Sequence, residues 1–474
     1  MKWNKFVVLL FLFSFSLNSF SAFYFPIKWW DETVYANLGY DLQKNPLDYS
    51  FTHGWGDRVF DWWDKAGFRP PLLPYIIAFV DLITNSNQFF VNLIIPFAGA
   101  VGAVLLYFLS KKLFNENIAI YSSLFLAFSP TYVQISGKTL TDILATTFTI
   151  AAFFAFWIGF EKKVTKFKYL SGFLIALAIL SKYTSLIIIP TFFIFLVLRN
   201  KNLKFLKDKD LIISFLILLL TLSPLFIYGY FSYGTPLGAF IHAWRGASYW
   251  GGVQPWYFFI QNSFLMFSAI IFLFLIGFYL MLRFFKNEPN KLFVLTWFIV
   301  FLLFFSSLLH KEERFFLPLF PAFCIIAAFG LEKFEKFKKI QNYVFTLILL
   351  ITLASTLLML YIENKANDSK PVYCFYQSVS FLKNTDSNSV IFTDDSPIVY
   401  YYTHRESDFY TDNNGVKNLD KLISENFANR SAYVLWTLYG APTDLRQILE
   451  NDTNFKTVFS CPEDSSLAVV YQHI

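Results

Sequence analysis

The sequence predicts an α-helical polytopic membrane protein with a small α/β domain at its C-terminal end, and three observations lead to this prediction. Of the 474 residues, 56% are hydrophobic and only 15% are charged. A soluble protein of this length needs more charge to cover its surface. Apolar runs of spanning length recur along most of the chain, and from about Asn364 the composition becomes that of a soluble domain.

The positive net charge does not indicate a nucleic-acid partner. The formal charge is +6, but the Lys and Arg residues lie in short clusters between apolar runs, where membrane topology places them. We therefore predict the lipid bilayer as a partner, and no nucleic acid.

The N-terminal segment has the pattern of a secretory signal. Lys2 and Lys5 precede an apolar run, and residues 19–22 offer a cleavage site. Apolar residues resume at Phe23, however, so that the run reaches the roughly 20 residues that cross a bilayer. An uncleaved first span is the favoured interpretation.

Eleven spans are predicted, counting the first. Residues 27–87 follow it as an extracytoplasmic loop, in which 71–83 are apolar but too short to cross and suit an interfacial or re-entrant helix. The pair 169–181 and 183–199 is the weakest, because one long span there would invert everything after it. The later runs cover 88–110, 117–136, 142–160, 169–181, 183–199, 210–231, 258–282, 292–309, 314–331 and 342–362.

Basic clusters predict the orientation of these spans. The clusters fall on alternate connections, on the side of Lys2 and Lys5, and the positive-inside rule makes that side cytoplasmic. We expect a multi-pass plasma-membrane protein with a cytoplasmic N-terminus and an extracytoplasmic C-terminal domain. The clusters are Lys111-Lys112, 162–168, 199–209, 283–291 and 333–339.

Two domains are expected, a transmembrane domain over 1–363 and a soluble α/β domain over 364–474. Residues 390–393 and 432–436 suit buried strands, whereas 375–383, 417–427 and 443–450 have helical spacing. Cys374 and Cys461 lie in this domain, where a disulfide and two free buried thiols both remain open.

Acids and bases gather on the predicted outward side of the membrane. Each has a simple structural explanation, since carboxylates cap helices, lysines end them, arginines reach headgroups and histidines are solvated. The span interiors stay almost free of charge, however. Together the residues indicate a site where a carboxylate activates a hydroxyl and cations hold a phosphate. They are Asp31, Glu32, Arg69, Lys138, Asp142, Lys182, His242, Arg245, and the run His310, Lys311, Glu312, Glu313 and Arg314.

Five short motifs occur in the order and spacing of one membrane family. They are WDETVYANLGYDL, RPPLLPYIIA, KTLTDILATTF, LAILSKYTSLIIIP and RFFLPLFPAF. Over roughly residues 1–335 the chain resembles the glycosyltransferases of the GT-C fold, specifically protein O-mannosyltransferases and lipid A aminoarabinose transferases. The resemblance implies an inverting transferase. Its sugar arrives on a polyprenyl-phosphate carrier and passes to a protein, lipid or glycan acceptor on the extracytoplasmic side.

The resemblance also implies residue roles. Asp31 matches the family's first-loop aspartate, proposed as the base, Glu32 matches its acidic neighbour, and Asp142 matches a second acid that supports the site. Arg69 and Arg314 match the cations that bind the donor phosphate. The remaining candidates are Lys138 and Lys182 as reserve cations, and Tyr35, Tyr183, His242, Arg245 and His310 as lining of the substrate pocket.

Two departures from the family pattern argue against a lipid A specificity. Val34 and Phe68 stand where lipid A enzymes have a basic and an acidic residue, respectively. We predict no cofactor, because side chains alone can hold a monophosphate donor, although a divalent metal is not excluded.

Two other functions compete with the transferase. A lipid or solute transporter would also need many spans, but transporters usually place ionisable residues near the midplane, whereas here they lie at span ends. An assembly protein anchored by its spans would not need the five motifs.

Overall fold

A computed structural model describes residues 5–24, 29–51, 65–249, 252–285, 288–334, 338–412, 415–416, 418–438, 443–462 and 467–474. The chain forms two compact units. Unit 1 comprises Met1–Pro26, Gly67–Leu73 and Asn87–Tyr361, and unit 2 comprises Ile27–Ala66, Pro74–Ser86 and Ile362–Ile474. The predicted division into domains 1–363 and 364–474 stays a prediction.

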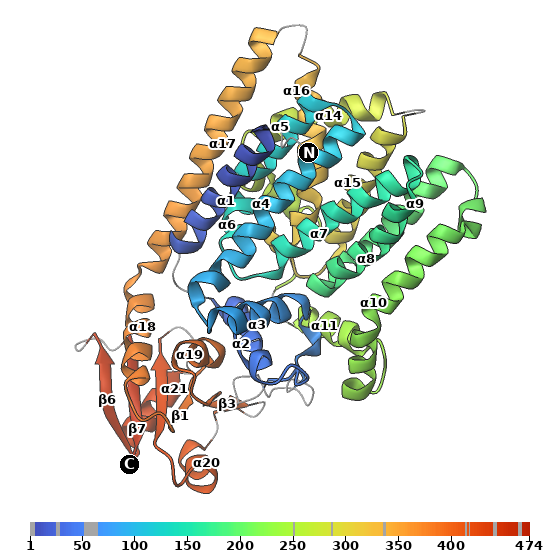
Figure 1. Cartoon of the computed structure of the whole chain (residues 1–474). Coiled ribbons are helices and arrows are strands. Elements are labelled where there is room, and N and C mark those ends of the chain that lie inside the picture. Colours follow the sequence, from blue (N-terminus) through green and yellow to red (C-terminus); the bar gives the residue numbers. More distant parts are fainter. Residues whose placement is uncertain are drawn as a thin grey trace. The chain divides into compact units, whose positions relative to one another are not determined.

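Unit 1 is a bundle of helices (Figure 1). Its helices are α1 (Lys5–Tyr24), α4 (Gln88–Leu113), α5 (Glu116–Phe128), α6 (Pro130–Ser136), α7 (Thr141–Phe156), α8 (Thr165–Ser181), α9 (Ile188–Asn200), α10 (Lys209–Tyr233), α11 (Gly238–Tyr249), α12 (Phe258–Gln261), α13 (Ser263–Phe267), α14 (Ile270–Arg283), α15 (Pro289–Ser307), α16 (Phe320–Glu332) and most of α17 (Lys338–Asn367). Short helical turns are η1 (Ala66–Phe68), η2 (Trp157–Glu161), η3 (Tyr183–Ile187), η4 (Lys204–Lys207) and η5 (Glu313–Leu319).

Among the described residues, eight helices are long and apolar enough to cross a membrane, or nine if the bent pair α5 and α6 is one span. The prediction of a polytopic helical fold is therefore confirmed. The count differs from the predicted eleven for physical reasons. Pro130 opens α6 and helps to bend the pair by 60°, α8 has only 17 residues, and the expected span 258–282 is broken before α14, where Ser268 adopts a φ of 52°.

The weakly predicted pair of spans is two antiparallel helices. The chain leaves helical geometry at Lys182, between α8 and η3. Arg199 at the end of α9 lies 3.5 Å from Glu161, just before the start of α8. Because α8 begins and α9 ends on the same side of unit 1, the chain reverses direction between them. Of the two, the segment Tyr183–Asn200 has the length and hydropathy of a span, and the predicted second crossing at 169–181 stays a prediction.

Aromatic side chains form much of the core of unit 1. The rings of Phe153 and Trp297 stack at 3.8 Å and those of Phe156 and Phe192 at 3.9 Å. The indole N–H of Trp297 donates to the carbonyl of Pro318 at 3.2 Å. The core therefore fixes η5, which carries Arg314.

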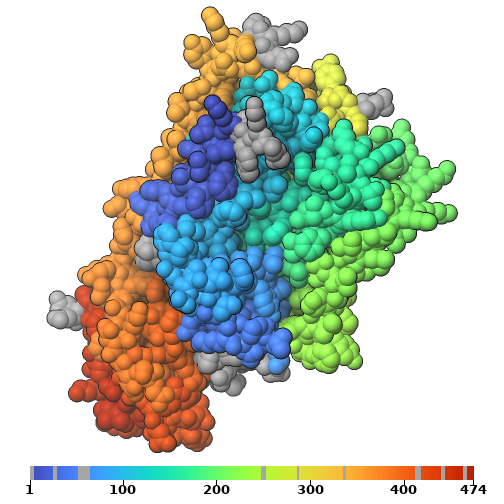
Figure 2. Space-filling view, in the orientation of Figure 1, coloured from blue at the N-terminus to red at the C-terminus, as the bar shows by residue number. Residues whose placement is uncertain are grey.

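Helix α17 packs along one side of the bundle. Its Phe345 ring lies 4.7 Å from Tyr121 of α5, and its Thr356 hydroxyl donates to the carbonyl of Phe128 at 2.7 Å. In Figure 2 its orange atoms border the dark-blue atoms of α1. The last predicted span is thus part of the bundle.

Unit 2 contains helices that follow the first span and the C-terminal sheet. Its sheet has the order β2-β1-β5-β7-β6, with β1 parallel to β2 and β5, and β7 antiparallel to β5 and β6. The elements are α2 (Trp30–Lys44), most of α3 (Leu72–Thr84), α18 (Lys370–Lys383), β1 (Val390–Phe392), α19 (Ser396–Thr403), β2 (Ser407–Asp408), β3 (Thr411–Asp412), β4 (Gly415–Val416), α20 (Leu419–Asn426), β5 (Ala432–Thr437), α21 (Thr443–Asn451), β6 (Phe455–Cys461) and β7 (Ala468–His473).

Side chains alternate across the two faces of this sheet, as the pleat requires. Val434 and Trp436 belong to the core on the side of α20 and α21, whereas Tyr433 and Leu435 pack with residues of α18 and α19. Both faces are covered, which explains why β1 and β5 read as continuous apolar runs. The predicted C-terminal α/β fold is confirmed.

Cys374 of α18 and Cys461 of β6 form a disulfide, which settles the alternative left open by the sequence. Cys324 is a free, buried thiol of α16. The bridge closes a separation of 87 residues, and a loop of this length typically gains about 2–4 kcal/mol from the constraint.

We expect reduction of this disulfide, or a Cys374→Ser change, to lower the melting temperature of unit 2. Unfolding without reductant should expose one alkylatable thiol, and unfolding with reductant should expose three, because the chain contains 3 cysteines. Mass spectrometry of the alkylated protein checks this. Three reactive thiols without reductant would contradict the bridge, and Cys324→Ser serves as a control that leaves it intact.

Candidate active site

In unit 1, the turn before α7 and the break after α8 bring two predicted site residues together. Asp142 lies in the first turn of α7, and its carboxylate forms an ion pair with the ammonium group of Lys182. The two side chains are 3% and 15% exposed. A carboxylate at a helix N-terminus is favourable, but a pair this buried is stable only while both partners remain.

A second charged group adjoins the first. Glu312 accepts hydrogen bonds from Nε of Arg314 at 2.6 Å and from Nη2 at 3.0 Å, and its Oε1 lies 3.0 Å from Nε2 of His310. Burial alone would raise the pKa of Glu312, but Arg314, His310 and the charge of Lys182 hold that pKa below its ordinary value. The ammonium group of Lys182 also lies 4.3 Å from the centre of the Phe315 ring. Two acids and two cations therefore form one network.

Tyr183 joins the segment around Arg69 to this network. Its hydroxyl donates to the carbonyl of Gly67 at 2.7 Å and lies 3.4 Å from that of Arg69. Gly67 has no side chain where the ring of Tyr228 approaches it. Tyr183, the residue after Lys182, thus holds the backbone at Arg69, which is also predicted to bind the donor phosphate.

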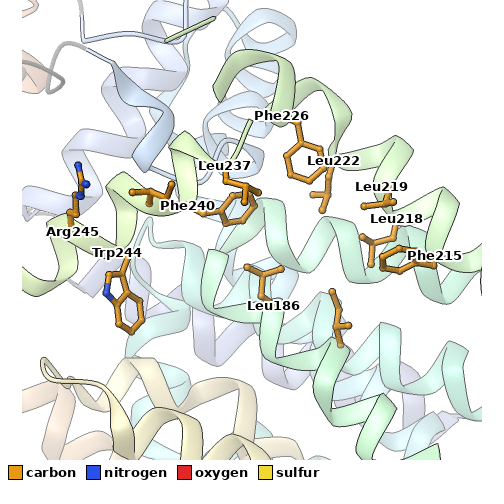
Figure 3. A pocket seen from close by; sticks show the side chains of 12 residues that line it. Leu186, Phe215, Leu218, Leu219, Leu222, Phe226, Leu237, Phe240, Trp244 and Arg245 are labelled. Carbon is orange, nitrogen blue, oxygen red and sulfur yellow. The ribbon is translucent and has the colours of Figure 1, made fainter. Parts of the chain in front are cut away.

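An apolar groove lies beside Tyr183. Its volume is about 500 Å³, and Arg245 is the charged residue among its lining. Phe240 lines the groove, and its ring lies 4.7 Å from that of Tyr183. In Figure 3, Arg245 stands at one end of the row of side chains and Phe215 at the other. The lining is Leu186, Ile189, Phe215, Leu218, Leu219, Leu222, Phe226, Leu237, Phe240, Ile241, Trp244 and Arg245.

In unit 2, helix α2 carries the first predicted acids. Glu32 is 2% exposed, and its Oε2 accepts a hydrogen bond from the backbone N–H of Trp29 at 3.2 Å, which is one of the two hydrogen bonds of a capping box. Asp31 is half-buried in the same turn, and Tyr35 is buried one turn later. The hydrogen bond to Trp29 gives Glu32 a structural role, and the predicted catalytic roles of Asp31 and Glu32 both stay predictions.

The remaining predicted residues lie in unit 1. Lys138 belongs to the turn before α7, where its carbonyl accepts from the N–H of Leu140 at 2.8 Å. His242 is on α11 with Arg245, and its ring lies 4.4 Å from that of Tyr233. Lys311, which the sequence places in the charged run 310–314 without a role of its own, is 4% exposed and donates to the carbonyl of Gln254 at 2.9 Å. The signal in the sequence that could have identified Lys311 is its place within a run of charged residues.

Two further acids stand between β1 and α19 in unit 2. Burial raises the pKa of Asp394 to about 7 and that of Asp395 to about 6. A carboxyl whose pKa is higher in the folded state binds extra protons there, so folding is most favourable at low pH and weakens as pH rises through the folded pKa.

We expect the melting temperature of unit 2 to fall between pH 5 and pH 8 and the fall to be smaller in an Asp394→Asn variant. Scanning fluorimetry of the detergent-solubilised protein measures it. Asp444→Asn, at an exposed position, is the control. Equal pH dependence in all three proteins would contradict the expectation.

The fold is that of a membrane protein of the GT-C class, as the comparisons confirm. A structure of ArnT from Cupriavidus metallidurans, bound to undecaprenyl phosphate, matches with a TM-score of 0.77 over 99% of this chain and 98% of that one, at 12% identity. The archaeal oligosaccharyltransferase AglB from Archaeoglobus fulgidus, in complex with an inhibitory peptide and a dolichol-phosphate, matches with a TM-score of 0.62 over 91% and 68%, at 16% identity. At these identities the likeness shows the fold.

The model of the Alg9-like mannosyltransferase family matches residues 44–443. The chain belongs to this family. GPI mannosyltransferase 3 of Candida albicans is 25% identical over 294 residues, covering 60% of this chain and 58% of that one. The chain thus spans little more than half the length of the curated relatives it matches. The predicted membership of a GT-C glycosyltransferase family is confirmed.

Proposed function

We propose that this protein transfers a sugar, with inversion, from a polyprenyl-phosphate carrier to an acceptor hydroxyl on the extracytoplasmic side of the membrane. The observation that carries the proposal is the charge network of Asp142, which is buried, and of Lys182, Glu312 and Arg314, which are half-buried, beside an apolar groove. A lipid-linked phosphate needs both features: cations for its head and a dry surface for its chain.

The proposed reaction uses the residue roles that the family resemblance implies. The Asp31 carboxylate takes the proton of the acceptor hydroxyl, and the acceptor oxygen forms a bond to the anomeric carbon. The bond from that carbon to the phosphate oxygen breaks, and the polyprenyl phosphate leaves with the electron pair. Arg69 and Arg314 stabilise the negative charge that grows on the phosphate, supported by Lys182. Asp142 keeps Lys182 in place, and no metal is required.

The groove would hold the isoprenoid chain of the donor. Its lining is aliphatic and aromatic apart from Arg245, and such a surface gains free energy by removing a hydrocarbon chain from water. Arg245 at one end offers a partner for the phosphate. The solved structure of ArnT, similar in fold, is bound to undecaprenyl phosphate.

We expect a Leu219→Trp change, which fills the groove, to raise KM for a long-chain donor about tenfold, a loss of about 1.4 kcal/mol in binding. A donor with a chain of about ten carbons should be affected less than twofold, because it leaves most of the groove empty. Leu220→Trp is the matched control, since Leu220 is 73% exposed and lies outside the lining. Equal effects on both donors would show that the chain binds elsewhere.

Two features support the extracytoplasmic side. The disulfide of unit 2 belongs to an oxidising compartment. Along the chain, α7 runs from Asp142 to the basic cluster 162–168, and α8 returns from there to Lys182. Site residues and basic clusters thus occupy alternate helix ends, and the positive-inside rule assigns the site to the outer side.

The test is to incubate the purified protein with a panel of polyprenyl-phosphate sugars and measure donor consumption by mass spectrometry. Mannosyl carriers come first, because the chain belongs to the Alg9-like mannosyltransferase family. Release of polyprenyl phosphate together with a glycosylated acceptor is the expected result. Uptake or translocation of the donor without cleavage would favour a transporter instead.

A further inference from the structure

Helix α2 depends on its neighbours for its stability and its position. It has 15 residues, and isolated helices of that length are marginal in water. The position of Asp31 in its first turn therefore depends on what packs against the rest of the helix. Within unit 2, that neighbour is α19 of the C-terminal sheet domain.

Three contacts join α2 to α19 and the residue after it. The side-chain amide of Asn37 donates to the carbonyl of Pro397 at 2.8 Å. The hydroxyl of Tyr400 donates to Oδ1 of Asp41 at 2.8 Å, and the rings of Tyr40 and His404 stack at 4.4 Å. The contacts follow one face of α2 over more than one turn. They therefore fix the position of the helix along its axis and its rotation about that axis.

These contacts are buried and specific. Asn37 is 1% exposed, Tyr400 2% and Asp41 8%. A buried carboxylate that loses its donor costs far more than the hydrogen bond itself gains. On another face of α2, Gly39 has no side chain where Ile77 of α3 approaches. The helix is thus held between α3 and α19 with little room to shift.

Helix α19 is itself anchored in the sheet. It connects β1 to its parallel neighbour β2, and the hydroxyls of Ser396 and Ser407 each donate to the other residue's carbonyl at 3.0 Å. The sheet therefore sets the position of α19, and α19 in turn sets the position of α2.

We propose that the C-terminal domain positions the helix of the catalytic base, with Tyr400 as a positioning residue that acts through Asp41. The inference rests on the proposed function, because it assigns Asp31 as the base. A reacting group displaced by 1 Å can lose about a hundredfold in rate. The cations proposed for the donor phosphate belong to unit 1, so donor binding should not depend on Tyr400.

The experiment compares Tyr400→Phe with Tyr471→Phe in the full-length protein. Tyr471 is also buried in this domain, but its hydroxyl contacts Glu450 at 3.4 Å and not α2. Tyr400→Phe should lower kcat at least about tenfold while KM for the donor and the Kd of polyprenyl phosphate stay within twofold. Hydrogen exchange in residues 30–44 should become faster. Tyr471→Phe should change none of these values.

Two additional variants guard against a trivial loss of folding. Asp41→Asn keeps an acceptor for Tyr400 and should retain most of kcat, whereas Asp41→Ala should behave like Tyr400→Phe. Asn37→Ala removes one hydrogen bond to a backbone carbonyl and should lower kcat in the same direction with donor binding intact. A Tyr400→Phe protein with normal kcat and normal exchange in α2 would overturn the inference.

Its failure is distinguishable from failure of the proposed function. If an Asp31→Asn protein still transfers sugar, Asp31 is not the base, and the proposed function fails together with the reason to position α2. An inactive Asp31→Asn protein beside a Tyr400→Phe protein equal to Tyr471→Phe overturns the positioning role alone.

Discussion

Replacing Asp31 by Asn should lower the turnover number at least about a hundredfold, because a positioned general base contributes roughly 10²–10⁴ to the rate. An amide has nearly the shape of the carboxylate but cannot take the acceptor proton. The substitution leaves the cations proposed to bind the donor phosphate in place, so KM for the donor should change little. Product formation from a polyprenyl-phosphate sugar, measured by mass spectrometry at saturating donor, gives the result.

Glu32 supplies the matched control for this prediction. Its side chain accepts from the N–H of Trp29, and a Gln at this position keeps an acceptor oxygen. Glu32→Gln should therefore retain most activity, whereas Glu32→Ala loses a hydrogen bond to a charged acceptor, worth about 1.5–3 kcal/mol. If Glu32→Gln is as inactive as Asp31→Asn, both acids act chemically and the capping role is not sufficient. A transporter or an anchored assembly protein would retain its function in the Asp31→Asn variant.

The sequence predicts the bundle well because hydrophobicity over some 20 residues is a local property. It also predicts which residues form the network, since charged side chains stand out beside apolar spans. It does not predict how they pair. Asp142 and Lys182 are 40 positions apart, and only the packing of α7 on α8 brings them together.

The sequence alone did not predict the contacts between residues that are far apart along the chain. Tyr400 and Asp41 are separated by 359 positions. Asp41 lies in the motif WDETVYANLGYDL without an assigned role, and Tyr400 lies outside all five motifs. The strands β6 and β7 were also missed, because several residues of β6 are exposed and its pattern is weak without a partner strand. The break at Ser268 is a backbone feature that an apolar run conceals.

The Asp142–Lys182 pair should have the largest effect on stability in unit 1. Asp142→Leu leaves the ammonium group of Lys182 in a site where it is 15% exposed, and removing one partner of a buried pair typically costs about 3–5 kcal/mol. We expect the melting temperature in detergent to fall by about 10 °C. Scanning fluorimetry checks it, with Glu116→Gln as control. Glu116 pairs with Lys111 where both side chains are more than 40% exposed, and such pairs contribute at most about 1 kcal/mol.

The double variant Asp142→Leu with Lys182→Met separates folding from catalysis. It removes both charges, and neutral side chains of similar volume often pack at least as well as a buried ion pair. Its melting temperature should therefore recover most of the loss. Its activity should not, because a missing cation near the leaving phosphate costs about a hundredfold or more. A double variant with both stability and activity restored would show that the pair serves the fold alone, and the phosphate would then depend on Arg69 and Arg314 without Lys182.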